Sequence, residues 1–160
     1  MKKKILVILT IIIVGIQFIR PEKNKSDDIS ANDISRHYAM PSDVDAILQR
    51  SCNDCHTNNT SYPWYTNIQP VGWWTQWHVN DGKSHLNFSE FVTYAPKRQH
   101  HKLEETLEMV RGGEMPLNSY LWIHGNAKLN PADTTVLIAW ADGLMKEIAA
   151  KHNLLVETKN

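Results

Sequence analysis

The chain lacks several features that would place it in common functional classes. Its only two cysteines are Cys52 and Cys55, so no second C-x-x-C pair exists to complete a four-cysteine zinc site. It has no charge excess, with 17 Lys plus Arg against 17 Asp plus Glu, so no overall field favours nucleic acid or an anionic surface. No strand pattern surrounds residues 40–60, which argues against a thioredoxin-like redox pair. With 160 residues, the chain has room for one domain of ordinary size and a tail.

Residues 1–20 have the pattern of a targeting signal. Three lysines at residues 2–4 precede an apolar run from Ile5 to Ile19, which is typical of a secretory signal but short for a membrane span. Neither a small-x-small cleavage site nor a lipid-anchoring cysteine follows the run. The pattern therefore favours an uncleaved signal anchor, with a removed signal peptide as the alternative. The lysines place the rest of the chain on the periplasmic side of the cytoplasmic membrane.

Residues 21–40 are polar and charged without a sustained apolar period, which predicts a flexible tether. The domain is expected over residues 41–157. Its first helix is expected to start at Ser42, with Ser42 and Asp45 placed like a capping box. Apolar side chains on one face of that helix lead to the two cysteines.

The sequence Cys52-Asn53-Asp54-Cys55-His56 spells C-x-x-C-H, the attachment motif for c-type haem. Two thiols in one turn can bond to the two vinyl groups of a haem, and the histidine presents an imidazole to the iron. A zinc site would need histidines to complete it, and a structural disulfide between cysteines this close is disfavoured. The motif predicts one covalently attached haem c per chain, with His56 as an iron ligand.

Further helices are predicted downstream, and with them an all-α fold. The expected ranges are about 73–77, 87–92, 102–111 and 131–151. Gly112-Gly113 is expected to end the third as a left-handed cap, and Asn130 to cap the fourth. The fourth helix is expected to pack on the helix that precedes Cys52. The tryptophans of the helix expected at 73–77 are predicted to form an aromatic cluster in the core. Contact of this cluster with a porphyrin would be a special case of the same packing.

Met115 is the candidate for the second iron ligand. It lies in Glu114-Met115-Pro116, where proline holds the backbone extended and a thioether is a known haem ligand. The alternative is that Met115 fills the core, as methionines often do. The remaining rivals for this position are histidines: His78, His85, His100, His101 and His124.

These segments resemble the class I cytochrome c fold and, more narrowly, the haem-binding domain family of cytochrome c-like proteins. The resemblance covers roughly residues 41–150. It is carried by the segments Cys52–Asn58, Tyr62–Tyr65, Leu86–Glu90 and Gly113–Pro116, with Tyr120 and Trp140. It implies Cys52 and Cys55 as thioether sites, His56 as the proximal ligand and Met115 as the distal ligand. The stretch from Trp73 to His101 is longer and richer in histidine than in a minimal cytochrome c.

The expected function is electron transfer by a single-haem protein tethered to the outer face of the cytoplasmic membrane. His/Met ligation would raise the reduction potential, and covalent attachment would retain the cofactor. Redox proteins are the expected partners, no nucleic-acid partner is expected, and the protein is not expected to be an enzyme. The alternatives are a small haem peroxidase, if the distal position is open, and a haem-based redox or gas sensor.

Overall fold

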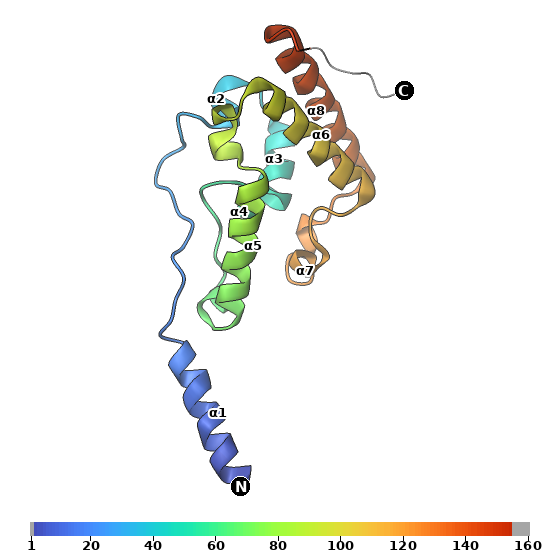
Figure 1. The fold of residues 1–160 in the computed structure, drawn as a ribbon. Helices are drawn as coiled ribbons and strands as arrows, with labels where there is room; N and C mark the ends of the chain where they lie inside the picture. The colour runs from blue at the N-terminus through green and yellow to red at the C-terminus, as the bar shows by residue number, and fades with distance from the viewer. Residues whose placement is uncertain (1, 155–160) are drawn as a thin grey trace.

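A computed structural model describes residues 2–154 of the chain. Met1 of the predicted signal and residues 155–157 of the predicted domain lie outside this range. Within it there are helices and turns but no strand, which confirms the all-α prediction (Figure 1). The elements are α1 (Lys2–Ile16), α2 (Ile34–His37), α3 (Ser42–Ser51), α4 (Asn53–His56), η1 (Trp64–Asn67), α5 (Val71–His85), η2 (Phe88–Thr93), α6 (Pro96–Gly112), α7 (Asn118–Leu121), η3 (Gly125–Ala127) and α8 (Pro131–Lys151).

The core forms where α3, α6 and α8 meet. Leu103 of α6 and Ile148 of α8 are fully buried, and Leu48 of α3 is nearly so. The main partner of α8 is α6 rather than the expected α3. The reason is length, because α6 and α8 span 17 and 21 residues whereas α3 spans 10. A long apolar stripe needs an equally long partner to bury it.

Two predicted helix ends are confirmed in atomic detail. The Asn130 side chain accepts hydrogen bonds from the backbone N–H groups of Ala132 and Asp133, and the Asp133 carboxylate accepts one from the Asn130 N–H. This is a capping box, and it starts α8. At the end of α6, Gly113 has φ +69°, the left-handed conformation that glycine adopts without strain.

The start of α3 differs from the prediction. Pro41 occupies the N-cap position, so no side-chain capping bond forms there and Ser42 is the first helical residue. The expected capping box between Ser42 and Asp45 is therefore wrong. Instead, the Asp43 carboxylate accepts a hydrogen bond of 2.9 Å from the Val44 N–H, which satisfies one of the free donors of the first turn.

Residues 21–40 differ from the expectation of a flexible tether. Ile34 and Tyr38 are buried in the core, and the Tyr38 hydroxyl donates to Gln99 at 2.7 Å. Farther upstream, the Asn24 side chain donates to the Thr57 carbonyl and to the Thr60 hydroxyl, both at 2.8 Å. Composition alone suggested an unattached stretch, because the anchoring groups are few and are separated by polar residues.

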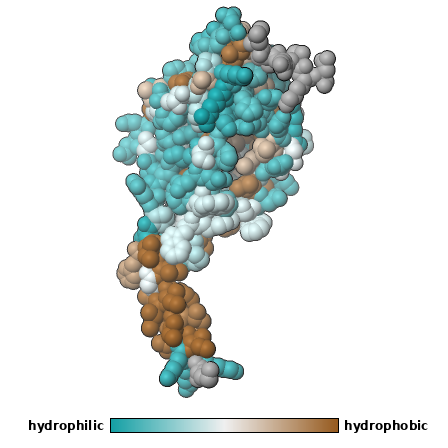
Figure 2. All heavy atoms as spheres, in the orientation of Figure 1, coloured by the Kyte–Doolittle hydropathy of each residue, from teal (hydrophilic) through white to brown (hydrophobic). Residues whose placement is uncertain are grey.

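The apolar helix α1 stands apart from the body, and its side chains are exposed (Figures 1 and 2). Among residues 2–154, no helix reaches the length and apolar character required to cross a membrane.

Tryptophan placement corrects another expectation. Trp74 and Trp77 are 44% and 60% exposed, so the predicted aromatic core cluster is wrong. They lie on α5, which runs to His85 and is much longer than the short helix predicted. The face of α5 that packs inward carries Gly72, Gln76 and Val79 instead.

Candidate functional site

The predicted site residues lie around one crevice. Cys52, Cys55 and His56 from the motif turn and Met115 from the loop after α6 all line it, together with residues of α5 and α7. Met115 and His56 are 59 positions apart in sequence, so only the folded chain brings them together. The crevice lies where α4, α5 and the loop after α6 meet.

The motif turn is built as a break between two helices. The α3 helix ends at Ser51, and Cys52 takes φ −129° before the chain re-enters one helical turn, α4. The backbone N–H groups of Cys55 and His56 both donate to the Cys52 carbonyl at 3.1 Å. The motif therefore forms a closed turn at the end of α3, slightly different from the simple helix end that was predicted.

A glycine lets α5 approach this turn closely. A Cβ atom at Gly82 would lie 2.8 Å from the Cys55 carbonyl oxygen and 3.0 Å from the Cys55 Cβ. Contacts below about 3.0 Å to backbone atoms are hardly found for real side chains. No residue larger than glycine fits at position 82 without moving α5 away from the motif.

The ring of His56 is oriented by the backbone. Its Nδ1 atom lies 2.9 Å from the Leu86 carbonyl oxygen, which can only accept, so Nδ1 carries the proton. The Nε2 atom is then the one with a free lone pair, the tautomer that a metal-binding histidine requires. Burial lowers the pKa of His56, against the opposing effect of this hydrogen bond, so the imidazole is neutral at pH 7.

The Leu86 carbonyl is itself held in place by the chain that follows. The Asn87 N–H donates to the Tyr94 hydroxyl at 3.0 Å, and the Asn87 side chain donates to Asn58 at 2.8 Å. The Asn58 N–H donates to the Ser89 hydroxyl at 3.1 Å. The segment after α5 is thus tied to the loop after the motif, which fixes the orientation of His56.

The two thiols are uncharged at neutral pH. Burial raises the pKa of Cys52 to about 12, with a further contribution from Cys55, and burial together with Asp54 raises the pKa of Cys55 to about 11. Zinc binds thiolates, and reactive redox cysteines have lowered pKa values. Within residues 2–154 no group of three or more potential metal-binding His, Cys, Asp or Glu side chains occurs. The raised pKa values therefore argue against a reactive redox pair, and the described residues place no further ligands beside the two cysteines to complete a zinc site.

The Met115 backbone is tied to the end of α6. The N–H groups of Glu114 and Met115 donate to the Met109 carbonyl at 2.9 and 3.4 Å, and Pro116 restricts the backbone of Met115, the residue before it. The other described methionines lie elsewhere: Met109 is exposed on α6, while Met40 and Met145 pack against the core. Of the methionines in residues 2–154, only Met115 lines the crevice.

Hydrogen bonding and position separate the rival histidines. Both ring nitrogens of His124 are engaged, with the Tyr120 carbonyl at 3.1 Å and the Tyr65 hydroxyl at 3.0 Å. His101 lies between Glu104 and Glu105 on α6, outside the crevice. His85 and His100 do not line it either. His78 does, and its Nδ1 donates to the Trp74 carbonyl at 2.9 Å, so its Nε2 makes it the main rival of Met115.

A hydrogen-bonded cluster, which sequence reasoning missed, closes the crevice. The Tyr120 hydroxyl donates to the Asp54 carboxylate at 2.7 Å, and the Tyr120 ring stacks on His124 at 4.1 Å. Burial, followed by this bond, raises the pKa of Tyr120 well above its usual range. Asp54, one of the two residues between the cysteines, thus holds α7 against the motif. No local pattern relates residues 54 and 120.

A second crevice adjoins the first. It shares Cys55, His78 and Tyr120 with the first and extends to Trp74 and Ile123. The two enclose only about 50 and 70 Å³, against about 300–1,000 Å³ for a typical cofactor pocket. The donor set fits a haem, but a porphyrin needs a wider space than the described structure encloses.

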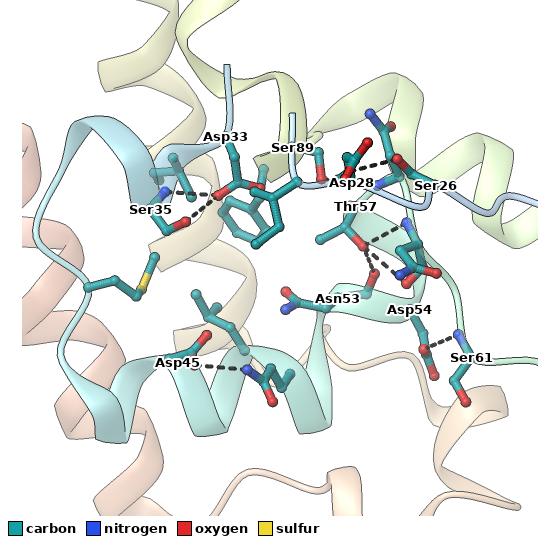
Figure 3. Close-up of a pocket in the computed structure, with 18 of the residues that line it drawn as sticks. Ser26, Asp28, Asp33, Ser35, Asp45, Asn53, Asp54, Thr57, Ser61 and Ser89 are labelled. Carbon is teal, nitrogen blue, oxygen red and sulfur yellow. Dashed lines mark hydrogen bonds between the residues drawn. The ribbon is translucent and has the colours of Figure 1, made fainter. Parts of the chain in front are cut away.

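A larger groove, about 520 Å³, lies on the far side of the motif turn (Figure 3). Its walls are partly polar and partly apolar, and several of the polar side chains are already paired, such as Asp45 with Gln49 and Asp54 with the Ser61 N–H. Neither motif cysteine lines it, nor do His56 and Met115. The groove therefore offers a haem neither a thiol nor an imidazole, and the thioether that lines it belongs to Met40.

The chain matches a family model described as a haem-binding domain over residues 11–143. No curated protein and no solved structure matches the chain.

Proposed function

Because the chain belongs to the haem-binding domain family, we propose that it attaches one haem c covalently and acts as an electron carrier. The observation that carries the proposal is that Cys52, Cys55, His56 and Met115 line the same crevice, while the hydrogen bond of the His56 Nδ1 to Leu86 leaves Nε2 as the metal-binding nitrogen. When bound, the haem supplies reversible one-electron chemistry between ferrous and ferric iron.

Each residue of the crevice has a defined part in this proposal. Cys52 and Cys55 hold the porphyrin through thioether bonds, so the cofactor cannot dissociate. His56 presents Nε2 because Leu86 fixes its Nδ1 proton. Met115 presents a soft thioether, and His/Met ligation is known to raise the reduction potential. Burial of the crevice limits the access of water, which tunes the potential further.

The loop from Gly113 to His124 must open for the porphyrin to enter. This loop forms part of the walls of the two narrow crevices, and residues of the motif turn, η1 and α5 form the remainder. It is held by side-chain hydrogen bonds from Tyr120 to Asp54 and from Tyr65 to His124. These bonds can break without disturbing the core of α3, α6 and α8, so opening at this loop costs less than separating core helices.

An optical spectrum of the haem-loaded protein tests the proposal. The protein is expressed with a c-type haem maturation system, and covalent attachment is read from the reduced spectrum. Met115 ligation predicts a weak far-red absorption band in the oxidised form, which is lost in Met115→Ala and kept in the matched control Met109→Ala. A bound haem without this band would refute Met115 as ligand. His78→Ala would then test the rival, and peroxide turnover and carbon monoxide binding would test the peroxidase and sensor functions.

The proposal also includes export and membrane attachment through the N-terminal segment. It is supported by the lysines at residues 2–4, which form the start of α1 before its apolar run, and by the exposure of the α1 side chains. The domain then lies on the periplasmic side, where other redox proteins are its partners. Flotation of the full-length protein with phospholipid vesicles and the mass of the mature chain test this part. Loss of about the first twenty residues would show a cleaved signal peptide instead.

A further inference from the structure

A group of large apolar side chains is exposed at one end of the domain. We call it the aromatic face, and it consists of Trp64, Ile68, Val71, Trp74 and Trp77, exposed by 76, 47, 37, 44 and 60%. All five lie in η1, in the first turns of α5 or between them. Single exposed apolar side chains are ordinary, but a concentration of this size on one short segment marks an interaction surface.

A haem in the crevices would cover only part of this surface. Val71 and Trp74 line the second crevice, so a cofactor there would contact them. Trp64, Ile68 and Trp77 line neither crevice, and they remain exposed whether or not the cofactor is bound.

The aromatic face lies next to the apolar helix α1. The Gln17 side chain, directly after α1, accepts from the Gln69 N–H at 2.9 Å and donates to the Gln69 carbonyl at 3.1 Å. The Trp73 indole N–H donates to the Ile19 carbonyl at 2.7 Å. The end of α1 is thus attached to the segment that carries the aromatic face, and in Figure 2 pale side chains of intermediate hydropathy border the brown helix.

We propose that the aromatic face docks on the membrane surface, with Trp64 and Trp77 in the interfacial layer of the lipid. This inference rests on the membrane attachment through α1 proposed above. Tryptophan is enriched at membrane–water interfaces, because its ring is apolar while its N–H can bond to water or headgroups. The attachment of α1 at Gln69 and Trp73 brings this face to the membrane whenever α1 is inserted.

Docking also orients the crevice. The second crevice shares Val71 and Trp74 with the aromatic face, so the wall of the crevice that these two residues form lies at the membrane surface in the docked state. A redox partner embedded in the same membrane would then reach the crevice from the lipid side, without the domain having to turn.

Lipid photolabelling of the full-length, haem-loaded protein tests the inference. The protein is placed in vesicles of phosphatidylcholine and phosphatidylglycerol that contain a phospholipid with a diazirine on its acyl chain, and adducts are mapped by mass spectrometry. We expect adducts on α1 and on residues 64–77, and none on α8. Trp64→Ser/Trp77→Ser should reduce the adducts on residues 64–77 severalfold and leave those on α1 unchanged. The control Met109→Ser removes an exposed apolar side chain from α6 and should change neither.

The outcomes distinguish docking of the aromatic face from membrane attachment through α1, the proposal on which it rests. Adducts on α1 without adducts on residues 64–77 would refute docking while supporting attachment. Failure of the protein to float with the vesicles would overturn the attachment and the docking together, and the haem spectrum would be unaffected. Equal labelling of residues 64–77 in wild type and the double variant would also refute the role of the two tryptophans. If the aromatic face is not labelled and sedimentation in detergent shows a dimer that buries it, a second copy of the chain covers this face instead of lipid, which would refute docking on the membrane.

Discussion

Substituting Gly82 with alanine should destabilise the site, although the same change usually stabilises a helix. Alanine in place of an interior helical glycine gains about 0.5–1 kcal/mol from reduced backbone entropy. At position 82 the new Cβ would lie 2.8 Å from the Cys55 carbonyl oxygen. This oxygen belongs to the backbone of the motif turn, so it cannot rotate away.

The magnitude follows from the two opposing effects. Forcing an additional methyl group into a closely packed contact costs about 1–3 kcal/mol, which exceeds the gain in helix propensity. We expect a net loss of about 1–2 kcal/mol, which for a chain of this size lowers Tm by roughly 2–8 °C. Because Cys55 belongs to the displaced turn, the fraction of chains that carry covalent haem should also fall.

The chain provides a matched control. Gly143 lies on the exposed side of α8, and a Cβ there would meet no atom within 4 Å. Gly143→Ala should therefore raise Tm by about 1–4 °C. Thermal unfolding followed by circular dichroism gives Tm for both variants, and haem content is measured per chain by absorbance. An equal rise of Tm in both variants, with full haem content, would refute the close approach of α5 to the motif.

Two further substitutions test the contacts around the crevice. Tyr120→Phe removes the donor to Asp54 and should lower the free energy of unfolding by about 1–3 kcal/mol, as for hydrogen bonds to charged groups; urea unfolding measures it, and no change would contradict the bond. Glu90→Gln replaces one of the two carboxylate oxygens that accept hydrogen bonds from Asn32 and Asn58 at 2.9 Å. We expect it to lower the free energy of unfolding by about 1–2 kcal/mol at pH 7. The pKa of Glu90 in the folded protein is lowered from 4.5, mainly by the Asn32 hydrogen bond. The ionised Glu90 therefore stabilises the fold fully above pH 4.5, and this stabilisation is lost as the pH falls through the lowered pKa of the folded protein. Urea unfolding at several pH values should show the difference between wild type and Glu90→Gln shrink below pH 4.5, and a constant difference would exclude the ionised carboxylate as its source.

The motif and the helix ends were predictable because their causes are local. A capping box such as that of Asn130 acts within four residues, and a left-handed glycine such as Gly113 acts on a single turn. Position 42 was misjudged for an equally local reason, since Pro41 fits the N-cap geometry and moves the serine into the helix. The tryptophans were misjudged because their apolar rings suit a core and an interface equally well.

The sequence by itself determined the all-α fold, the haem-binding family and the motif turn of Cys52, Cys55 and His56. The helices and the motif turn depend on residues close together in the chain, and the family is recognised from short segments that each carry their own pattern, such as Cys52–Asn58 and Tyr62–Tyr65. Tertiary structure alone decided that Met115 and His78 reach the crevice, that Asp54 bonds to Tyr120, and that residues 21–40 pack against the body. These contacts join residues tens of positions apart, and whether they meet depends on how the helices pack, which no local pattern encodes.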